Sequence, residues 1–304
     1  MVGKSPRSTL DPTLDIVFRM LFSSAEGRDS LRALLTAVLR PKVPITNVEI
    51  LNPELPREHV GARGVILDLL VSFGDGRRID VEMQADKRAA FRERIVYYWA
   101  KDFGGQLVRG EDFSALRPVI SVLFLDYVEL PGSRWHSTYR LREEEDHSAL
   151  TDVMELHIIE LPKRNGPTRQ EDAALLPWIR FLGAKTDEEV KEACMGSQDV
   201  AKANEHLRRL SASPRARDLA REREEALALY RIEIATTRDE AKAEGKAEGK
   251  AEALLRILKR RFGPAQAEVH DRVLRAGEED VDRWLDRAID ATSVDDVFRP
   301  PHAA

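Results

Sequence analysis

Cysteine is almost absent from this chain, with Cys194 as the single example in 304 residues. One thiol excludes an internal disulfide framework and a structural zinc site built from several thiolates. Long apolar runs are also missing: the longest, near residues 65–71 and 119–125, hold about seven residues, against the roughly 20 that cross a bilayer. The first residues carry no apolar signal segment. We therefore expect no membrane helix and a cytoplasmic chain.

An excess of positive charge is lacking too. The chain has 48 Lys and Arg against 53 Asp and Glu, a formal net charge of -5. Any contact with a polyanion must therefore come from a local basic patch. The hydrophobic fraction of 42% beside a charged fraction of 33% predicts a soluble globular chain, long enough for two domains.

Several catalytic motifs are absent as well. The seven histidines show no zinc-binding HExxH spacing, and neither a nucleophile elbow nor a phosphate-cradling glycine loop occurs. Acidic side chains remain as the candidates for chemistry.

What is present is an ordered succession of helix and strand patterns. Asp11-Pro12 is typical of a helix start, and a second helix over residues 28–39 ends before Pro41. Strands are predicted at residues 45–51, 65–71, 77–84, 119–125 and 153–161, and a helix at residues 87–108. Beyond Pro162 the strand patterns disappear. This order predicts an α/β fold in which helices flank a sheet.

One predicted hairpin brings two carboxylates together. Residues 65–71 are apolar on both faces apart from Asp68, as in a central strand. A turn signal at residues 74–76 leads into residues 77–84, where apolar and polar side chains alternate. With a three-residue loop, Asp68 lies opposite Glu82, and their Cβ atoms are roughly 5 Å apart.

Opposed carboxylates repel each other unless a cation or a proton lies between them. With a main-chain carbonyl, that of Met83, they form a hard oxygen site suited to Mg²⁺, and a bound Mg²⁺ can deliver hydroxide to a phosphodiester. The pattern therefore predicts nuclease chemistry. The alternative for Asp68 is a hydrogen-bonded structural aspartate. Asp80, one pair nearer the turn than Glu82, is predicted to be solvated.

These residues resemble the PD-(D/E)XK nuclease core, with its central mixed sheet flanked by helices. They are more closely similar to the recombination-promoting nucleases, a family also labelled as transposases, in which Glu-x-Gln replaces Glu-x-Lys. The resemblance covers about residues 10 to 130. Its segments are Leu14-Asp15-Ile-Val-Phe18-Arg19, Ile66-Leu67-Asp68-Leu69, Val81-Glu82-Met83-Gln84, Phe91-Arg-Glu-Arg94-Ile-Val-Tyr97-Tyr98, Gln106-Leu-Val-Arg-Gly110 and Pro118-Val-Ile-Ser-Val.

The resemblance implies that Asp68, Glu82 and the Met83 carbonyl bind Mg²⁺ or Mn²⁺. Gln84 occupies the place of the lysine that positions or activates the attacking water. A glutamine is neither a base nor a cation, so it can orient water or phosphate without supplying charge. Asp15 corresponds to the acid on the first helix that often completes such sites.

Two of these assignments have a structural alternative. Asp15 is equally typical of a first-turn acid paired with Arg19. Arg94 suits a phosphate contact, because a guanidinium reaches two oxygens at once, and it suits a helix surface equally well. The predicted basic groove for DNA consists of Lys87, Arg88, Arg92 and Arg94.

Composition divides the chain further. We expect a nuclease-like core at residues 10–165, a helical extension at residues 166–213, a charged helical linker with an AEGK repeat at residues 214–253, and a small helical domain at residues 254–300. The repeat has nothing to bury, which favours an exposed spacer helix over a binding strip. The last segment resembles a small domain of unknown function that is often appended to these nucleases.

Two functions follow from the sequence. The first is a Mg²⁺-dependent DNA endonuclease that promotes recombination or serves a mobile element, and the resemblance is compatible with a homodimer. The second is an inactive nuclease-like protein that serves interaction or oligomerisation, which the missing lysine and the acidic composition leave open.

Overall fold

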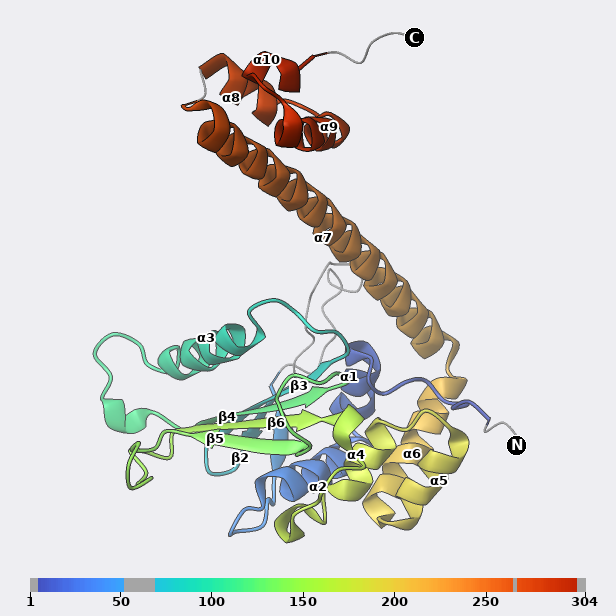
Figure 1. Ribbon diagram of the computed structural model, residues 1–304. Coiled ribbons are helices and arrows are strands. Elements are labelled where there is room, and N and C mark those ends of the chain that lie inside the picture. Colours follow the sequence, from blue (N-terminus) through green and yellow to red (C-terminus); the bar gives the residue numbers. More distant parts are fainter. Residues whose placement is uncertain (1–4, 52–68, 265–266, 300–304) are drawn as a thin grey trace. The chain divides into compact units, whose positions relative to one another are not determined.

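The computed structural model describes residues 5–51, 69–264 and 267–299 (Figure 1). The chain divides into two compact units, Met1–Leu227 and Ala228–Ala304. The long helix α7 (Pro214–Phe262) contains the boundary between them. No helix in the described ranges has the length and apolarity that crossing a bilayer requires.

The first unit is built on one mixed sheet, in which six strands of the described chain follow the order β1-β2-β3-β4-β6-β5. The β3–β4 and β4–β6 pairs are parallel and the others are antiparallel. The strands are β1 (Val48–Ile50), β2 (Leu69–Phe73), β3 (Arg78–Gln84), β4 (Val119–Leu125), β5 (His136–Arg140) and β6 (Met154–Glu160). The predicted α/β fold with a mixed central sheet is confirmed.

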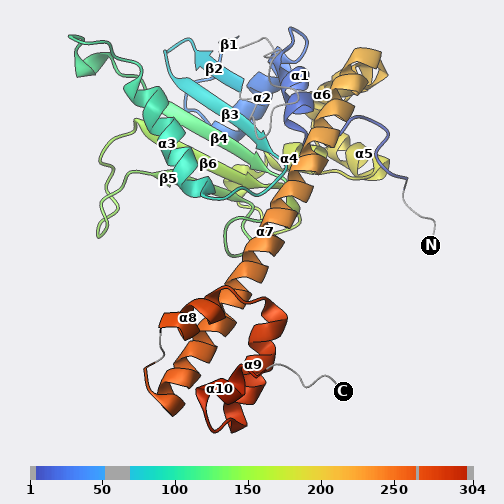
Figure 2. The same cartoon turned by 90° about the horizontal axis from the view of Figure 1, so that it is seen from above.

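Helices cover the two faces of this sheet unequally. Among the elements that the structure describes, Figures 1 and 2 show α3 over one face and a group of helices on the other. The helix α3 is Phe91–Gly104, and the group comprises α1 (Asp15–Ser23), α2 (Arg28–Leu39), α4 (Leu176–Leu182), α5 (Asp187–Met195) and α6 (Gln198–Ala212). Short 3-10 turns lie at η1 (Phe113–Ala115), η2 (Leu161–Lys163) and η3 (Gln170–Asp172).

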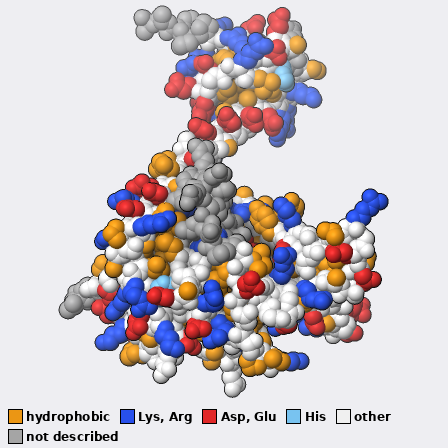
Figure 3. Space-filling view, turned by 180° about the vertical axis from the view of Figure 1, so that it is seen from behind, with side chains coloured by type: hydrophobic (Ala, Val, Ile, Leu, Met, Phe, Trp, Pro, Cys, Tyr) orange, Lys and Arg blue, Asp and Glu red, His pale blue; other side chains and the backbone are white. Residues whose placement is uncertain are grey.

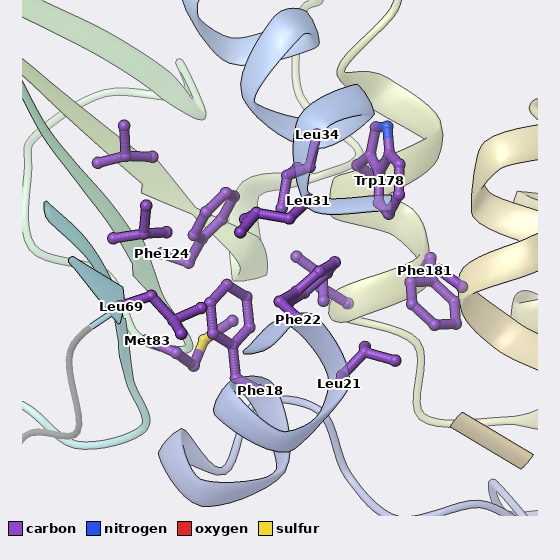
Figure 4. Close-up of a cluster of buried hydrophobic side chains, with 14 of the residues drawn as sticks. Phe18, Leu21, Phe22, Leu31, Leu34, Leu69, Met83, Phe124, Trp178 and Phe181 are labelled. Atoms are coloured by element: carbon purple, nitrogen blue, oxygen red, sulfur yellow. The ribbon is translucent and has the colours of Figure 1, made fainter. Parts of the chain in front are cut away.

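The main hydrophobic core lies between the sheet and the helix group. Phe18 of α1 packs on Phe124 of β4, with ring centroids 5.7 Å apart, and Met83 and Leu69 close the same cluster (Figure 4). These side chains are at most 2% exposed, so each contributes about 1.5 to 3 kcal/mol to the free energy of folding. Apolar residues at helical spacing on α1 and alternate residues on β3 produce this layer.

Three local predictions differ from the structure. The helix α1 begins at Asp15 rather than at Asp11, because the Asp11 carboxylate accepts hydrogen bonds from the Thr13 amide and hydroxyl and forms a turn. The helix α3 begins at Phe91, after a left-handed Ala90 (φ 51°), and not at residue 87. The edge strand β5 was not predicted, because His-Ser-Thr-Tyr-Arg has little apolar alternation.

The second unit contains a small separate core. The end of α7 packs with α8 (Ala267–Leu274), α9 (Glu278–Asp290) and α10 (Val294–Val297). The Trp284 and Phe298 rings meet edge to face at 4.7 Å. Lys250 pairs with Glu278 at 2.7 Å and joins α7 to α9. The predicted small C-terminal helical domain is present.

Candidate functional site

The β2–β3 hairpin has the register that the sequence predicts. Leu69 pairs with Val81, Leu70 with Asp80, Val71 with Ile79 and Ser72 with Arg78, and the Phe73 amide donates to the Arg77 carbonyl at 3.0 Å across the turn. Asp68, the first predicted metal ligand, lies outside the described residues. The hairpin is thus described up to the pair next to the predicted Asp68–Glu82 opposition.

Glu82 and Gln84 lie side by side under α3. Both are 5% exposed, and Gln84 Nε2 donates a hydrogen bond of 2.8 Å to Glu82 Oε2. The parallel β3–β4 pairing sets Glu82 against Leu123 and Gln84 against Leu125, the two β4 residues that cluster with Phe91 and Ile95 of α3. The Met83 side chain points to the opposite face and packs in the main core.

Asp80 belongs to the same polar row, and here the expectation of a solvated residue is wrong. Asp80 is half-buried, two residues before Glu82 on the same face of β3. Burial, the charges of Glu82 and Asp102, and a hydrogen bond with Glu82 raise the pKa of Asp80 well above its usual value. Strict alternation along residues 80, 82 and 84 is the signal from which this cluster could have been found.

Removing the Asp80 charge is expected to stabilise the metal-free protein. Asp80→Asn keeps the shape and ends the repulsion with Glu82, so we expect the free energy of unfolding to rise by about 1 kcal/mol. Urea unfolding at pH 7 in EDTA measures this difference. Asp152→Asn, at an exposed aspartate, serves as the control and leaves stability unchanged. A destabilised Asp80→Asn would show that the charged carboxylate is needed by the fold.

Tyr127 reaches the row from the loop after β4. Its hydroxyl lies 3.4 Å from Gln84 Oε1, a long contact, and its ring meets Phe91 edge to face at 6.0 Å. Burial, followed by the charge of Glu129, raises the pKa of Tyr127, so the phenol stays protonated. No sequence pattern indicates Tyr127, because residues 84 and 127 come together through the parallel β3–β4 pairing.

The predicted basic groove is divided by Glu129. Lys87 Nζ lies 2.9 Å from Glu129 Oε2 and Arg92 Nε 3.0 Å from Glu129 Oε1. Burial opposes ionisation of Glu129, but these hydrogen bonds outweigh it and lower the pKa of this carboxyl. Arg94 stacks over the Tyr98 ring at 5.8 Å, and Arg88 is half-buried. On the face in Figure 3, basic and acidic side chains of the described residues are interspersed.

Asp15 forms a buried ion pair that neither interpretation of the sequence contained. Arg223 of α7 donates through Nε to both Asp15 carboxylate oxygens, at 2.9 and 3.0 Å, and through Nη2 to Oδ2. Arg223 is 2% and Asp15 7% exposed. The carboxylate that sequence reasoning placed in the site or beside Arg19 is therefore neutralised by a residue 208 positions away.

A sequence profile describing PD-(D/E)XK nuclease family transposases matches residues 12–236. The chain belongs to this family. The matched span includes the whole sheet, the Glu82-Met83-Gln84 segment and Arg223. No curated protein and no solved structure matches the chain. Members of the PD-(D/E)XK superfamily are generally metal-dependent nucleases. Membership of the family therefore indicates a nuclease or mobile-element role.

The polar row on β3 fits the divalent cation that the family implies. No three His, Cys, Asp or Glu side chains form a metal-binding group within residues 5–51, 69–264 and 267–299. Asp80 and Glu82 nevertheless meet as two partly desolvated carboxyl groups joined by a hydrogen bond, and the charge repulsion that raises the Asp80 pKa is what a divalent cation relieves. Their donors are all oxygens, as Mg²⁺ prefers.

This protein also contains a buried series of hydrogen-bonded titratable groups that no sequence pattern indicates. His136 Nδ1 lies 2.7 Å from Asp172, His136 Nε2 lies 2.9 Å from His157 Nδ1, and His157 Nε2 lies 2.9 Å from Glu155. Both histidines are fully buried. These three contacts need three protons, one more than two neutral imidazoles carry. Burial, followed by the charge of His157, lowers the pKa of His136 to about 4.

Acid is expected to destabilise the sheet through His136. In the unfolded chain this imidazole binds a proton near its usual pKa of 6.5, but in the fold it does so at about 4. The neutral His136 imidazole therefore contributes fully to the free energy of unfolding above pH 6.5, and this contribution is lost as the pH falls toward 4. Between pH 7 and pH 5 we expect a loss of about 2 kcal/mol in the free energy of unfolding, measured by urea titration. His136→Gln should flatten this slope and the exposed His147→Gln should not; an unchanged slope in His136→Gln would contradict the assignment.

Proposed function

We propose that this family member is a Mg²⁺-dependent DNA endonuclease that hydrolyses phosphodiester bonds in recombination or for a mobile element. The observation that carries the proposal is the row of Asp80, Glu82 and Gln84 on β3, in which two carboxylates stand together within the nuclease fold. The proposal extends the described β2–β3 register by one pair, to Asp68 and Glu82. Mn²⁺ is the natural substitute for Mg²⁺ at such a site.

In this proposal Glu82, Asp68 and the Met83 carbonyl hold the cation. A bound divalent cation supplies a nucleophilic hydroxide at neutral pH and stabilises charge on the phosphoryl oxygens. Gln84 fixes the Glu82 carboxylate through its 2.8 Å hydrogen bond. Because a neutral amide is neither an acid nor a base near neutral pH, Gln84 orients water or phosphate and leaves proton transfer to other groups.

The basic residues take different roles. Lys87 and Arg92 hold Glu129, so they position the loop after β4 as well as offering charge to DNA. Arg94 and Arg88 lie beside Tyr127, close enough to influence its hydroxyl, and are the proposed phosphate contacts. Asp15 is proposed to act through Arg223, as a positioning residue that joins α1 to α7.

Metal-dependent cleavage tests the proposal. The purified chain is expected to nick supercoiled plasmid with Mg²⁺ or Mn²⁺ and to leave it intact in EDTA. At 10 mM Mg²⁺ without DNA, we also expect a stabilisation of about 1 to 2 kcal/mol, seen as a higher unfolding temperature, which is missing in Glu82→Gln. A folded protein that neither cleaves DNA nor gains stability with either metal would refute the endonuclease.

That negative outcome would favour the second candidate, an inactive nuclease-like protein that serves interaction or oligomerisation. Two observations support this alternative. Glu82 is 5% exposed, and a glutamine stands at position 84 in place of the lysine. A homodimer, which sedimentation of the full chain would reveal, is compatible with both candidates.

A further inference from the structure

A cleft beside the edge strand β5 has the lining of an anion site. Its volume is about 480 Å³, and it lies between the loop before β5 and the loop before η3. No carboxylate is among its lining residues. The polar groups that face it are Ser133, Arg134, Ser137, Thr168 and Arg169.

Arg169 lines the cleft with its guanidinium held in place. Its Nε donates to Asp172 Oδ2 at 2.7 Å, which orients the guanidinium. Its Nη2 is buried and has no hydrogen-bond partner among the described residues. Part of the Arg169 side chain stays open to solvent, so the guanidinium is held in one orientation at the wall of the cleft.

The opposite wall carries Arg134, which is exposed and has no ion pair within the described part of the chain. The walls are joined, because Trp135 Nε1 donates to Thr168 Oγ1 at 3.3 Å. Below them, Lys163 Nζ donates to the Leu130 carbonyl and to Glu160, both at 2.7 Å. The guanidinium groups of Arg134 and Arg169 therefore lie on two loops that hydrogen bonds join to each other.

The net positive charge near the cleft and the types of its hydrogen-bond donors favour a phosphate group as the ligand. Near the cleft, Arg40 and Arg169 pair with the carboxylates of Glu171 and Asp172, and Arg134 adds one positive charge that no ion pair of the described residues matches. Guanidinium forks and hydroxyls are the donors that bind phosphate oxygens in protein–DNA contacts. A free carboxylate ligand would use one fork and leave the hydroxyls unpaired.

The position of the cleft fits DNA that also reaches Glu82. Gln84, Leu125 and Glu160 are neighbours at the ends of β3, β4 and β6, and the Glu160 amide donates to the Trp135 carbonyl beside the cleft. Three strand spacings of about 4.8 Å place the cleft roughly 14 Å from Gln84 across the sheet.

We propose that Arg134 and Arg169 bind a backbone phosphate of DNA a few nucleotides from the bond that is cleaved. The choice of DNA rests on the proposed function, whereas the phosphate chemistry of the cleft does not. A free phosphate is the other source of the same chemistry. The hydroxyls of Ser137 and Thr168 complete the contact.

Binding without cleavage tests the cleft. Fluorescence anisotropy with a labelled duplex in EDTA, over a range of NaCl concentrations, compares wild type with Arg134→Ala and the control Arg208→Ala, an exposed arginine on α6. We expect Arg134→Ala to bind about 10-fold more weakly, with a salt slope smaller by about 1, and the control to bind as wild type. Arg169→Gln should act in the same direction, with its folding checked by unfolding temperature.

Inorganic phosphate, titrated by calorimetry, distinguishes the two sources. Weaker DNA binding by Arg134→Ala establishes the backbone contact, even if the protein proves unable to cut DNA. Loss of phosphate binding in the variant with unchanged DNA binding would assign the cleft to free phosphate and overturn the DNA contact. Variants that match wild type with both probes, or a wild type that binds neither, overturn the cleft altogether, while metal-dependent cleavage would leave the endonuclease standing.

Discussion

Glu82→Gln is expected to lose more than about 100-fold of the metal-dependent cleavage rate, because groups that merely support a metal ligand already cost 10- to 100-fold when changed. The substitution keeps the size of the side chain and an oxygen for the 2.8 Å hydrogen bond from Gln84. It removes the negative charge that a divalent cation requires. Plasmid nicking under single-turnover conditions gives the rate.

Matched variants make this result specific. Asp68→Ala should lose as much cleavage as Glu82→Gln, whereas Asp152→Asn should cleave as wild type. The Glu82→Gln protein should also be at least as stable as wild type in EDTA, since the repulsion with Asp80 is gone. Cleavage that persists in both carboxylate variants would move the chemistry to another part of the chain.

Arg223→Met is expected to cost about 3 to 5 kcal/mol of the free energy of unfolding. The substitution leaves the Asp15 carboxylate buried without its guanidinium, which otherwise contacts both carboxylate oxygens. Chemical unfolding followed by tryptophan fluorescence reports this loss, because Trp178 lies in the main hydrophobic core, to which α1 also contributes.

A neighbouring ion pair supplies the control. Arg221 pairs with Asp218 on the exposed side of α7, so Arg221→Met should change stability by less than about 1 kcal/mol. The double variant Asp15→Leu with Arg223→Met should recover most of the loss, because two apolar groups replace the buried pair. Equal effects of Arg221→Met and Arg223→Met would mean that the Asp15 pair does not hold α1 to α7.

Local sequence patterns predict much of the fold. The helix at residues 28–39 has the predicted ends, and the hairpin register follows from the length of its turn, since Phe73 and Arg77 bond across it. The strand β5 is not indicated by the sequence because an edge strand needs no apolar alternation, and among the described strands β5 pairs with β6 alone.

Only part of the candidate site could be predicted from the sequence. Glu82 and Gln84 could be singled out because they share one strand face, and that pattern is written in consecutive residues. The Asp15–Arg223 pair and the contacts from His136 to Asp172 and His157 join distant segments, and no spacing rule connects them. Asp80 was misjudged because its burial depends on the helix that covers the sheet, which the alternation of β3 does not indicate.

Among the described residues, α3 is the one helix over the sheet face that carries Glu82, and this has a consequence for exchange with solvent. Of the 14 residues of α3, Phe91 and Ile95 are the buried ones, whereas every residue of β4 beneath it is buried. Segments with few buried contacts open at a lower free energy than the surrounding core. We therefore expect the amide hydrogens of α3 to exchange with deuterium well before those of β3 and β4. The Glu82 carboxylate would then be reached by water at the opening rate of one helix, without unfolding of the sheet.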